Sequence, residues 1–303
     1  MNNVYKKFRV HLDREFRACV YRLMNRSLFE EDFLRYLPKE FHETAKLVFD
    51  FRRFVLEEEK KIAKNIEEFR SRAPLIADTE RISSYSSPHS STFKKNEHGH
   101  AVPGDLTNSS IEAHMKTGVN KRGGLLLRRI VQGVNAKRIL ELGTNTGFSG
   151  CYFLSFKTVE SLVTIEGSSQ LCKIAIKNLH RISSNFKVLN MLFDEAIDKL
   201  IEESEKFDCA FIDGQHEREA VLHYFNRLLP LIKKGGIIIF DDIYWSDDMN
   251  QAWKELCRNP LFSQTYDFGS KGVCVLRLND TEPSRHYDIC EYIGRPSIFR
   301  KGW

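Results

Sequence analysis

The sequence predicts an α/β protein built on a doubly wound, mostly parallel sheet, and three observations support this prediction. Between residues 138 and 240, five short apolar runs alternate with segments whose apolar residues recur at helical spacing. Gly143 and Gly147 follow the first run, as expected where a buried strand turns tightly into a helix. Repeated strand-helix units are typical of a parallel sheet covered on both faces, which binds ligands beyond the carboxyl ends of its strands.

The length and composition fit one such domain with an additional segment. The chain has 303 residues, of which 42% are hydrophobic and 29% charged, with a formal net charge of +5. No apolar run approaches the roughly 18 residues that a membrane span requires, and the first residues do not resemble a signal peptide. The seven cysteines form no C-x-x-C pair, so we expect reduced thiols and a cytoplasmic protein.

Residues 1–77 are expected to form an N-terminal helical extension. Residues 4–26 combine an apolar stripe with a basic face, and a second helical region is predicted over 40–72, between Pro38 and Pro74. A basic amphipathic helix can bind a membrane surface or nucleic acid, or it can pack on the main domain with its charged face in solvent. We favour packing over nucleic-acid binding.

A change of composition follows this extension. Residues 78–110 are rich in Ser, His and Gly and contain few apolar residues, so they are predicted to form a flexible linker. Three histidines lie in it: His89, His98 and His100. Solvated loop residues explain these histidines better than a metal cluster does. The α/β domain is expected at 111–278 and a C-terminal tail at 279–303.

The elements of this domain are predicted in order. Strands are expected at 138–142, 161–166, 186–191, 207–213 and 237–240, and helices at 111–115, 123–131, 169–180, 194–201, 217–232 and 247–257. Two further strands, at 265–269 and 273–278, are joined by a Gly-Ser-Lys-Gly turn and read as a hairpin, giving seven strands with an antiparallel last strand. The loop at 116–122 is a candidate lid over the ligand site.

The turn after the first strand carries a ligand-binding signal. Glu141, Gly143 and Gly147 form an E-x-G-x-x-x-G pattern. A dinucleotide-binding turn would need its second glycine at position 145, which is Asn, and a P-loop would need a lysine after Gly147. Glu141 can accept hydrogen bonds from an amine of a ligand or from the loop's own N–H groups. An ordinary strand-to-helix turn without a ligand is the alternative.

Acidic residues gather at the ends of the predicted strands. Besides Glu141, Glu166 ends the second strand, Asp213 ends the fourth, and Asp241 and Asp242 follow the fifth. Carboxylates on one edge of a sheet repel one another unless a cation or a polar ligand joins them. A carboxylate at position 166 suits the two hydroxyls of a ribose. These acids predict a ligand site, with helix capping and loop solvation as the alternative.

These motifs resemble those of a known family. The glycine turn is similar to motif I of class I S-adenosylmethionine-dependent methyltransferases, which have a Rossmann-like sheet with an antiparallel last strand. The I-D-G-x-H segment at 212–216 and the D-D-I-x-W segment at 241–245 resemble a bacterial branch similar to catechol and caffeoyl-CoA O-methyltransferases. The resemblance covers residues 110–278. It implies methyl transfer from S-adenosylmethionine, with the hydroxyl of a small molecule as the expected acceptor.

The resemblance also implies which residues hold the cofactor. The expected contacts are Glu141, Gly143, Thr144, Asn145, Gly147, Ser149, Glu166, Gly167, Asp194 and Asp213. Relatives often carry Gly-Asp after the third strand for the adenine amine, whereas Met191-Leu192-Phe193 stands there in this chain. Either Asp194 or Phe193 with backbone groups is therefore expected to hold the adenine ring.

Metal-dependent relatives bind a divalent ion through acids after the fourth and fifth strands. Asp213, Asp241 and Asp242 match these positions, and their oxygens suit Mg²⁺ or Ca²⁺. The same acids can instead serve only as hydrogen-bond partners. His216 stands where these relatives have a catalytic lysine, so Asp213, His216 and Asp241 form the expected catalytic set, with His216 as general base. A metal ligand and a helix-start residue are the other roles open to His216.

Two other functions stay open. One is a methyltransferase for a larger target, such as a lipid, a sugar or a nucleic acid, docked by the basic N-terminus. The other is a methyltransferase-like binding protein without turnover. No N/D-P-P-Y/F motif follows the fourth strand, which weighs against methylation of amide or base nitrogen. A homodimer is compatible with the sequence.

Overall fold

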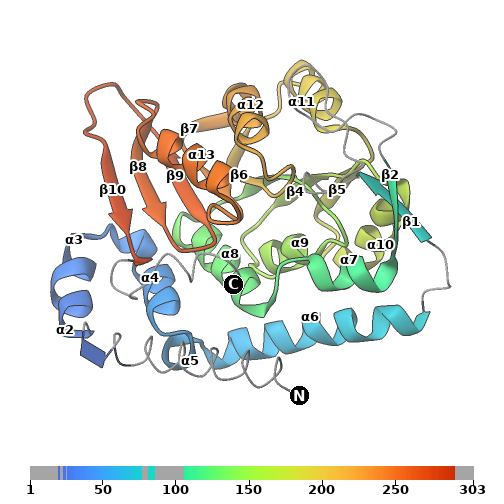
Figure 1. The fold of residues 1–303 in the computed structure, drawn as a ribbon, viewed down its shortest axis with the longest axis horizontal. Coiled ribbons are helices and arrows are strands. Elements are labelled where there is room, and N and C mark those ends of the chain that lie inside the picture. The colour runs from blue at the N-terminus through green and yellow to red at the C-terminus, as the bar shows by residue number, and fades with distance from the viewer. Residues whose placement is uncertain (1–19, 21–22, 25, 77–80, 86–105, 291–303) are drawn as a thin grey trace.

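A computed structural model describes residues 20, 23–24, 26–76, 81–85 and 106–290. A central sheet lies between layers of helices, and the N-terminal helices extend along one side of the molecule (Figure 1). The helix predicted at 4–26 lies outside the described residues except for its last few positions. No helix within the described ranges is long and apolar enough to cross a bilayer.

The central sheet has eight strands in the described part of the chain, in the order β10-β8-β9-β7-β6-β3-β4-β5. Their bounds are β3 (Arg138–Leu142), β4 (Ser161–Ile165), β5 (Phe186–Leu189), β6 (Phe207–Ile212), β7 (Ile232–Phe240), β8 (Phe262–Asp267), β9 (Gly272–Leu276) and β10 (Arg285–Asp288). β9 runs antiparallel to β7 and β8, and the other pairings are parallel. The doubly wound sheet with its antiparallel strand is confirmed. β10 adds an eighth strand because the expected tail pairs with the open edge of β8.

The strand order determines where a ligand can bind. β3 comes first along the chain among these strands but lies between β4 and β6, so the chain progresses in both directions from it. Such a switch point is the usual ligand site of a doubly wound sheet. Leu142 of β3 pairs with Ile212 of β6, which in turn pairs with Phe240 of β7. The carboxyl ends of β3, β6 and β7 therefore lie side by side.

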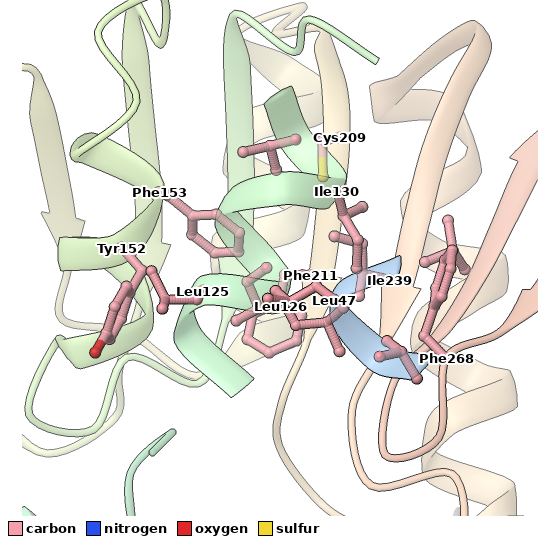
Figure 2. Close-up of a cluster of buried hydrophobic side chains, with 14 of the residues drawn as sticks. Leu47, Leu125, Leu126, Ile130, Tyr152, Phe153, Cys209, Phe211, Ile239 and Phe268 are labelled. Atoms are coloured by element: carbon pink, nitrogen blue, oxygen red, sulfur yellow. The ribbon is translucent and has the colours of Figure 1, made fainter. Parts of the chain in front are cut away.

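Helices cover both faces of this sheet. Their bounds are α7 (Ile111–Thr117), α8 (Lys121–Gly133), α9 (Phe148–Leu154), α10 (Ser169–Leu179), α11 (Phe193–Glu202), α12 (Arg218–Leu228), the short turn η3 (Leu229–Leu231) and α13 (Asp247–Cys257). Successive residues of β6 point to opposite faces, as a strand requires. Phe211 joins an apolar cluster with Leu125 of α8 and Phe153 of α9 (Figure 2), whereas Ile212 joins a second cluster with α11, α12 and α13.

The N-terminal region consists of several shorter helices. They are α2 (Arg26–Leu28), η1 (Phe29–Phe33), α3 (Leu34–Tyr36), η2 (Lys39–Phe41), α4 (His42–Phe49), α5 (Phe51–Phe54) and α6 (Glu57–Ile76). The helical region predicted over 40–72 is divided among η2, α4, α5 and α6. The carboxylate of Asp50 accepts a hydrogen bond from the N–H of Arg53 at 3.3 Å, and Glu59 accepts one from Leu56 at 2.8 Å. These side chains cap the starts of α5 and α6 and so divide the region into separate helices.

The predicted linker at 78–110 has regular structure at both ends. β1 (Arg81–Tyr85) and β2 (Leu106–Ser110) pair antiparallel, and β2 leads directly into α7. The composition did not indicate this pair, because backbone hydrogen bonds between strands do not require an apolar sequence. Residues 86–105, which include the three loop histidines, lie outside the described residues.

A buried ion pair joins the N-terminal helices to the domain. Arg129 of α8 donates two hydrogen bonds to the carboxylate of Glu59 on α6, at 2.7 and 2.8 Å. Its other donors reach the backbone oxygens of Glu43 and Phe54, each at 2.6 Å. Arg129 is 4% exposed and Glu59 is 1% exposed. Full hydrogen bonding is what allows such a charged pair to be buried.

Candidate active site

The turn after β3 has the geometry that its glycines predict. Gly143 and Gly147 have φ angles of 99° and 83°, in the left-handed region that favours glycine. A Cβ on Gly143 would lie 2.0 Å from the backbone oxygen of Asp213. The N–H of Gly147 donates to the backbone oxygen of Thr144 at 2.8 Å, and α9 begins at the next residue. The turn therefore lies directly against the end of β6.

Glu141 lies beneath this turn and is 0% exposed. Its carboxylate accepts hydrogen bonds from the hydroxyls of Ser149 and Thr164, the latter at 2.6 Å. The hydroxyl of Thr144 lies 2.5 Å from that of Thr164. Burial raises the pKa of Glu141 to about 7; the two hydroxyl bonds oppose this shift, and the charge of Glu166 adds to it. Glu141 and Ser149 thus support the turn from below.

Replacing Glu141 by Gln is expected to change how stability depends on pH. The pKa in the folded protein is about 7, above the usual 4.5, so between these values the folded protein holds a proton that the unfolded chain has released. The stability gained from this proton is fully present below the unfolded-state pKa of 4.5 and is lost as pH rises through the folded-state pKa of about 7. The total loss is about 3 kcal/mol. Wild type should therefore lose stability relative to Glu141→Gln as pH rises.

Urea unfolding of both proteins between about pH 5 and about pH 8 measures this difference. Glu160→Gln, at an exposed position, is the control and should follow the wild-type profile. A constant difference between wild type and Glu141→Gln across this range would contradict the raised pKa.

Glu166, just beyond β4, holds the loop that follows β3. Its two carboxylate oxygens accept hydrogen bonds from the N–H groups of Asn145 and Ser168, each at 2.9 Å. Burial raises the pKa of Glu166, and its bonds from backbone N–H groups oppose the shift. The backbone oxygen of Gly167 accepts from the side chain of Asn190 at 2.9 Å. Because a carboxylate has about four acceptor positions, Glu166 can also accept from ribose hydroxyls.

Asp194, at the start of α11, contacts α12. Its carboxylate lies 2.8 Å from Nε2 of His223 and 3.4 Å from Nε of Arg227. Phe193 instead lies against the turn after β6, since a Cβ on Gly214 would come within 2.8 Å of its ring. Of the two expected adenine contacts, Phe193 is therefore the better placed.

The acids after β6 and β7 meet around a lysine that the sequence did not single out. Lys271 lies in the turn between β8 and β9, and its Nζ donates to Oδ1 of Asp241. Lys271 is 4% exposed and Asp241 is 5% exposed. Burial alone would lower the pKa of Lys271, but the charges of Asp241, Asp242 and Asp213 outweigh burial and raise it. Lys271 is thus a buried cation among three carboxylates.

His216 stands beside two of these acids. Its Nε2 lies 3.8 Å from Oδ1 of Asp213 and 4.0 Å from Oδ2 of Asp242. Both distances exceed that of a hydrogen bond. Burial raises the pKa of Asp213 and Asp242, Asp241 raises both further, and Lys271 opposes the shift. The predicted catalytic set of Asp213, His216 and Asp241 is therefore brought together by the fold.

The same acids are not arranged around one cation site in this structure. Oxygens bound to one Mg²⁺ or Ca²⁺ lie about 2.0–2.6 Å from it, and hence within about 5 Å of one another. Asp213, Asp241 and Asp242 do not form a group, among the described residues, whose ligand atoms all lie within 4.8 Å of one another. Oδ1 of Asp241 accepts from Lys271 and from the N–H of Asp242. The metal site therefore stays a prediction, and the positive charge beside Asp241 in this structure is an ammonium.

A different group meets that distance within the described ranges, namely Asp267, Asp288 and Cys290. Its oxygens are already bonded to donors. Asp267 accepts from the N–H of Gly269 at 2.8 Å and from the hydroxyl of Tyr244, and Asp288 accepts from the N–H of Cys290 at 2.8 Å. These bonds fix the start of the turn between β8 and β9.

A cavity of about 250 Å³ opens beside the acids. Its polar lining includes Asp213, His216, Asp241, Asp242 and Lys271. Its apolar wall includes three residues of the N-terminal helices α4 and α5: Leu47, Val48 and Phe51. Leu47 also points into the apolar cluster of Figure 2, close to Leu126 and Phe211. The N-terminal extension thus forms part of the site.

Arg70 of α6 holds the loop predicted as a lid, which also lines the cavity. Its guanidinium donates to the backbone oxygen of Met115 at 2.7 Å and to that of Val119. It also lies 4.0 Å from the centroid of the Phe148 ring, a cation–π contact. The extension therefore positions this loop as well as the apolar wall.

Residues 140–243 match a family model described as a methyltransferase domain. A catechol O-methyltransferase from Niastella koreensis is 30% identical over 142 residues, which cover 45% of this chain and 63% of that protein. A caffeoyl-CoA O-methyltransferase from Populus kitakamiensis is 30% identical over 128 residues, covering 40% and 53%. The chain therefore spans less than two thirds of either relative. A solved O-methyltransferase from Bacillus cereus in complex with S-adenosylhomocysteine is 23% identical, with a TM-score of 0.45, and covers 55% of this chain and 90% of that one.

The match over 140–243 to a methyltransferase domain agrees with the strand order and the glycine turn, which are those expected of class I. The chain is similar to O-methyltransferases that include a catechol and a caffeoyl-CoA enzyme. The resemblance carried by the segments at 212–216 and 241–245 is thereby confirmed.

Proposed function

We propose that the chain transfers the methyl group of S-adenosylmethionine to a hydroxyl oxygen of a small molecule. The observation that carries this proposal is the position of Asp213. Its backbone oxygen lies against the glycine turn, and its side chain lies beside His216 on the wall of the cavity. The proposed cofactor site and the cavity thus lie next to each other at the end of β6, which is the arrangement that direct methyl transfer needs.

The cofactor is expected to lie along the turn after β3 and the ends of β4 and β6. The proposed contacts are Gly143, Thr144, Asn145, Gly147, Glu166, Gly167 and Asp213, with Phe193 beside the adenine ring. Glu141 and Ser149 support this surface from below and do not reach the ligand themselves, because Glu141 is fully buried and Ser149 is bonded to it.

His216 is the proposed general base. The acceptor oxygen attacks the methyl carbon, the carbon–sulfur bond breaks, and its electron pair stays on sulfur to give S-adenosylhomocysteine. The hydroxyl proton passes to Nε2 of His216, where the charges of Asp213 and Asp242, 3.8 and 4.0 Å away, stabilise the imidazolium that forms. Asp241 holds Lys271 beside the acceptor oxygen.

The cavity suits a small acceptor with an apolar body. A cavity of roughly 150 Å³ holds benzene in another protein, so about 250 Å³ accommodates one ring with substituents. Its lining includes both apolar residues and the proposed base, which would orient the hydroxyl of such a molecule toward His216.

Calorimetric titration with S-adenosylmethionine, followed by an assay of S-adenosylhomocysteine formation with phenolic acceptors, tests this proposal. Glu166→Ala should weaken cofactor binding about tenfold to a hundredfold, because losing a hydrogen bond to a charged group costs about 1.5–3 kcal/mol. Glu195→Ala, at an exposed position of α11, is the matched control and should stay within about twofold. Absence of cofactor binding by wild type would contradict the proposal, and binding without turnover would favour a non-catalytic binding protein.

A further inference from the structure

We propose that Lys271 takes the place of the divalent cation of metal-dependent O-methyltransferases, so that this chain methylates a single acidic hydroxyl without a metal. The inference rests on the proposed function, because it concerns the acceptor side of the same site. It departs from the pattern that the acids alone imply, in which three carboxylates share a metal ion.

The position of the Lys271 ammonium carries the inference. Its Nζ donates to Oδ1 of Asp241, which also accepts the N–H of Asp242 at 2.6 Å. A carboxylate oxygen has two lone pairs, so these two donors occupy it. A divalent ion bound through this oxygen would have to displace the ammonium, and an ion bound through the other oxygen would lie buried beside it; either is costly in a site this enclosed.

The backbone around Lys271 is fixed. Its carbonyl oxygen accepts from the N–H of Phe268 at 2.9 Å, and the neighbouring oxygen of Ser270 accepts from Ile243 at 3.2 Å. Asp267 closes the start of the same turn through Gly269. The ammonium is thus held at the cavity wall before any acceptor binds, as an electrostatic catalyst requires.

An ammonium and a metal ion select different acceptors. A divalent ion with open coordination positions can hold both oxygens of a vicinal diol, and this favours catechols. Lys271 has three N–H donors, of which Asp241 uses one. A second donor can hold one acceptor oxygen between Lys271 and His216, which both line the cavity. A second hydroxyl next to it on the acceptor adds nothing to the binding of that oxygen.

The class of acceptor is therefore a monohydroxylated ring. The ammonium stabilises the negative charge that develops on the oxygen as its proton leaves, and the apolar wall with Leu47 and Phe51 accepts the ring. A phenol with one hydroxyl should serve at least as well as the matching catechol.

Binding of Mn²⁺, measured by electron paramagnetic resonance, tests the inference without reference to activity. Wild type should bind no Mn²⁺ at concentrations up to on the order of 1 mM. Lys271→Met should bind it at least about tenfold more tightly, because its three carboxylates lose their cation. Lys254→Met, at an exposed position of α13, is the control and should behave like wild type. Binding of one Mn²⁺ per wild-type chain that is lost in Asp241→Asn would overturn the inference. This comparison uses only wild type and Asp241→Asn, so it does not depend on the folding of Lys271→Met.

Turnover gives the second readout. With a chelator present, wild type should keep its rate within about twofold, and kcat/KM for the monohydroxylated ring should equal or exceed that for the catechol. A rate lost on chelation and restored by Mg²⁺, or a catechol preferred more than about tenfold, would overturn the inference. Calorimetry with S-adenosylmethionine distinguishes failure of the two proposals. Failure to bind the cofactor contradicts the methyltransferase function, whereas the proposal for Lys271 is decided by the Mn²⁺ measurement.

Discussion

Replacing Glu59 by Ala should lower the free energy of unfolding by about 3–5 kcal/mol, because it leaves the guanidinium of Arg129 buried without a carboxylate. Glu59 makes two of the four hydrogen bonds of Arg129 described above, and it also caps the start of α6 through Leu56. Both roles are lost together. Urea unfolding at neutral pH measures the change.

The destabilisation caused by the unpaired charge of Arg129 can be separated from that caused by lost packing. Adding Arg129→Met to Glu59→Ala should restore part of the stability, because the buried guanidinium that lost its carboxylate is then removed as well. Glu58→Ala is the matched control: its side chain is 63% exposed, its ion pair with Arg128 is 3.6 Å long, and its effect should stay below about 1 kcal/mol. A Glu59→Ala effect as small as this control would show that the pair does not hold the extension to the domain.

Gly143→Ala should reduce the rate of methyl transfer about a hundredfold, because it moves the turn that holds the cofactor. The added Cβ would lie 2.0 Å from the backbone oxygen of Asp213, and neither group is a flexible side chain that can move aside. The φ of 99° would also cost a residue with a side chain about 1–3 kcal/mol. Initial rates, cofactor titration and urea unfolding measure these effects.

Gly118→Ala provides the comparison for stability. A Cβ at this position would meet its nearest atoms at 3.7 Å, and its φ is −66°, so unfolding should change by less than about 0.5 kcal/mol. If Gly143→Ala binds S-adenosylmethionine as tightly as wild type and turns over at the same rate, the turn after β3 is not the cofactor site.

Much of the fold is predictable from local patterns in the sequence. Strands β3 to β7 contain short apolar runs, and the helix at 247–257 begins after Ser246, whose hydroxyl accepts the N–H of Met249 as a helix cap should. Side chains that cap helices also explain why the helical region at 40–72 consists of several helices. The apolar spacing there continues across Asp50, whose bond to the N–H of Arg53 marks a break, as the bond of Glu59 to the N–H of Leu56 does at the start of α6.

The site was predictable where its residues lie at strand ends. Asp213, Asp241 and Asp242 could be expected together because parallel strands place their carboxyl ends on one edge. Lys271 could not, because a Gly-Ser-Lys-Gly sequence indicates a turn and gives no sign of which group, 30 residues earlier, the lysine contacts. The apolar wall was not predictable for the same reason, since the packing of α4 on α8 joins residues far apart in the sequence. The excess of acids without a countercharge was the one signal that a cation was missing.

The origin of the cavity's apolar wall has a consequence for redesign. Leu47, Val48 and Phe51 come from residues 42–54, outside the segment 140–243 that matches the methyltransferase model. The base, the lysine and the cofactor turn are all carried by the later part of the chain. If the proposed function holds, part of the wall that accepts the ring and the residues that carry the transfer lie in separate stretches, and exchanging α4 and α5 offers a route to new acceptors.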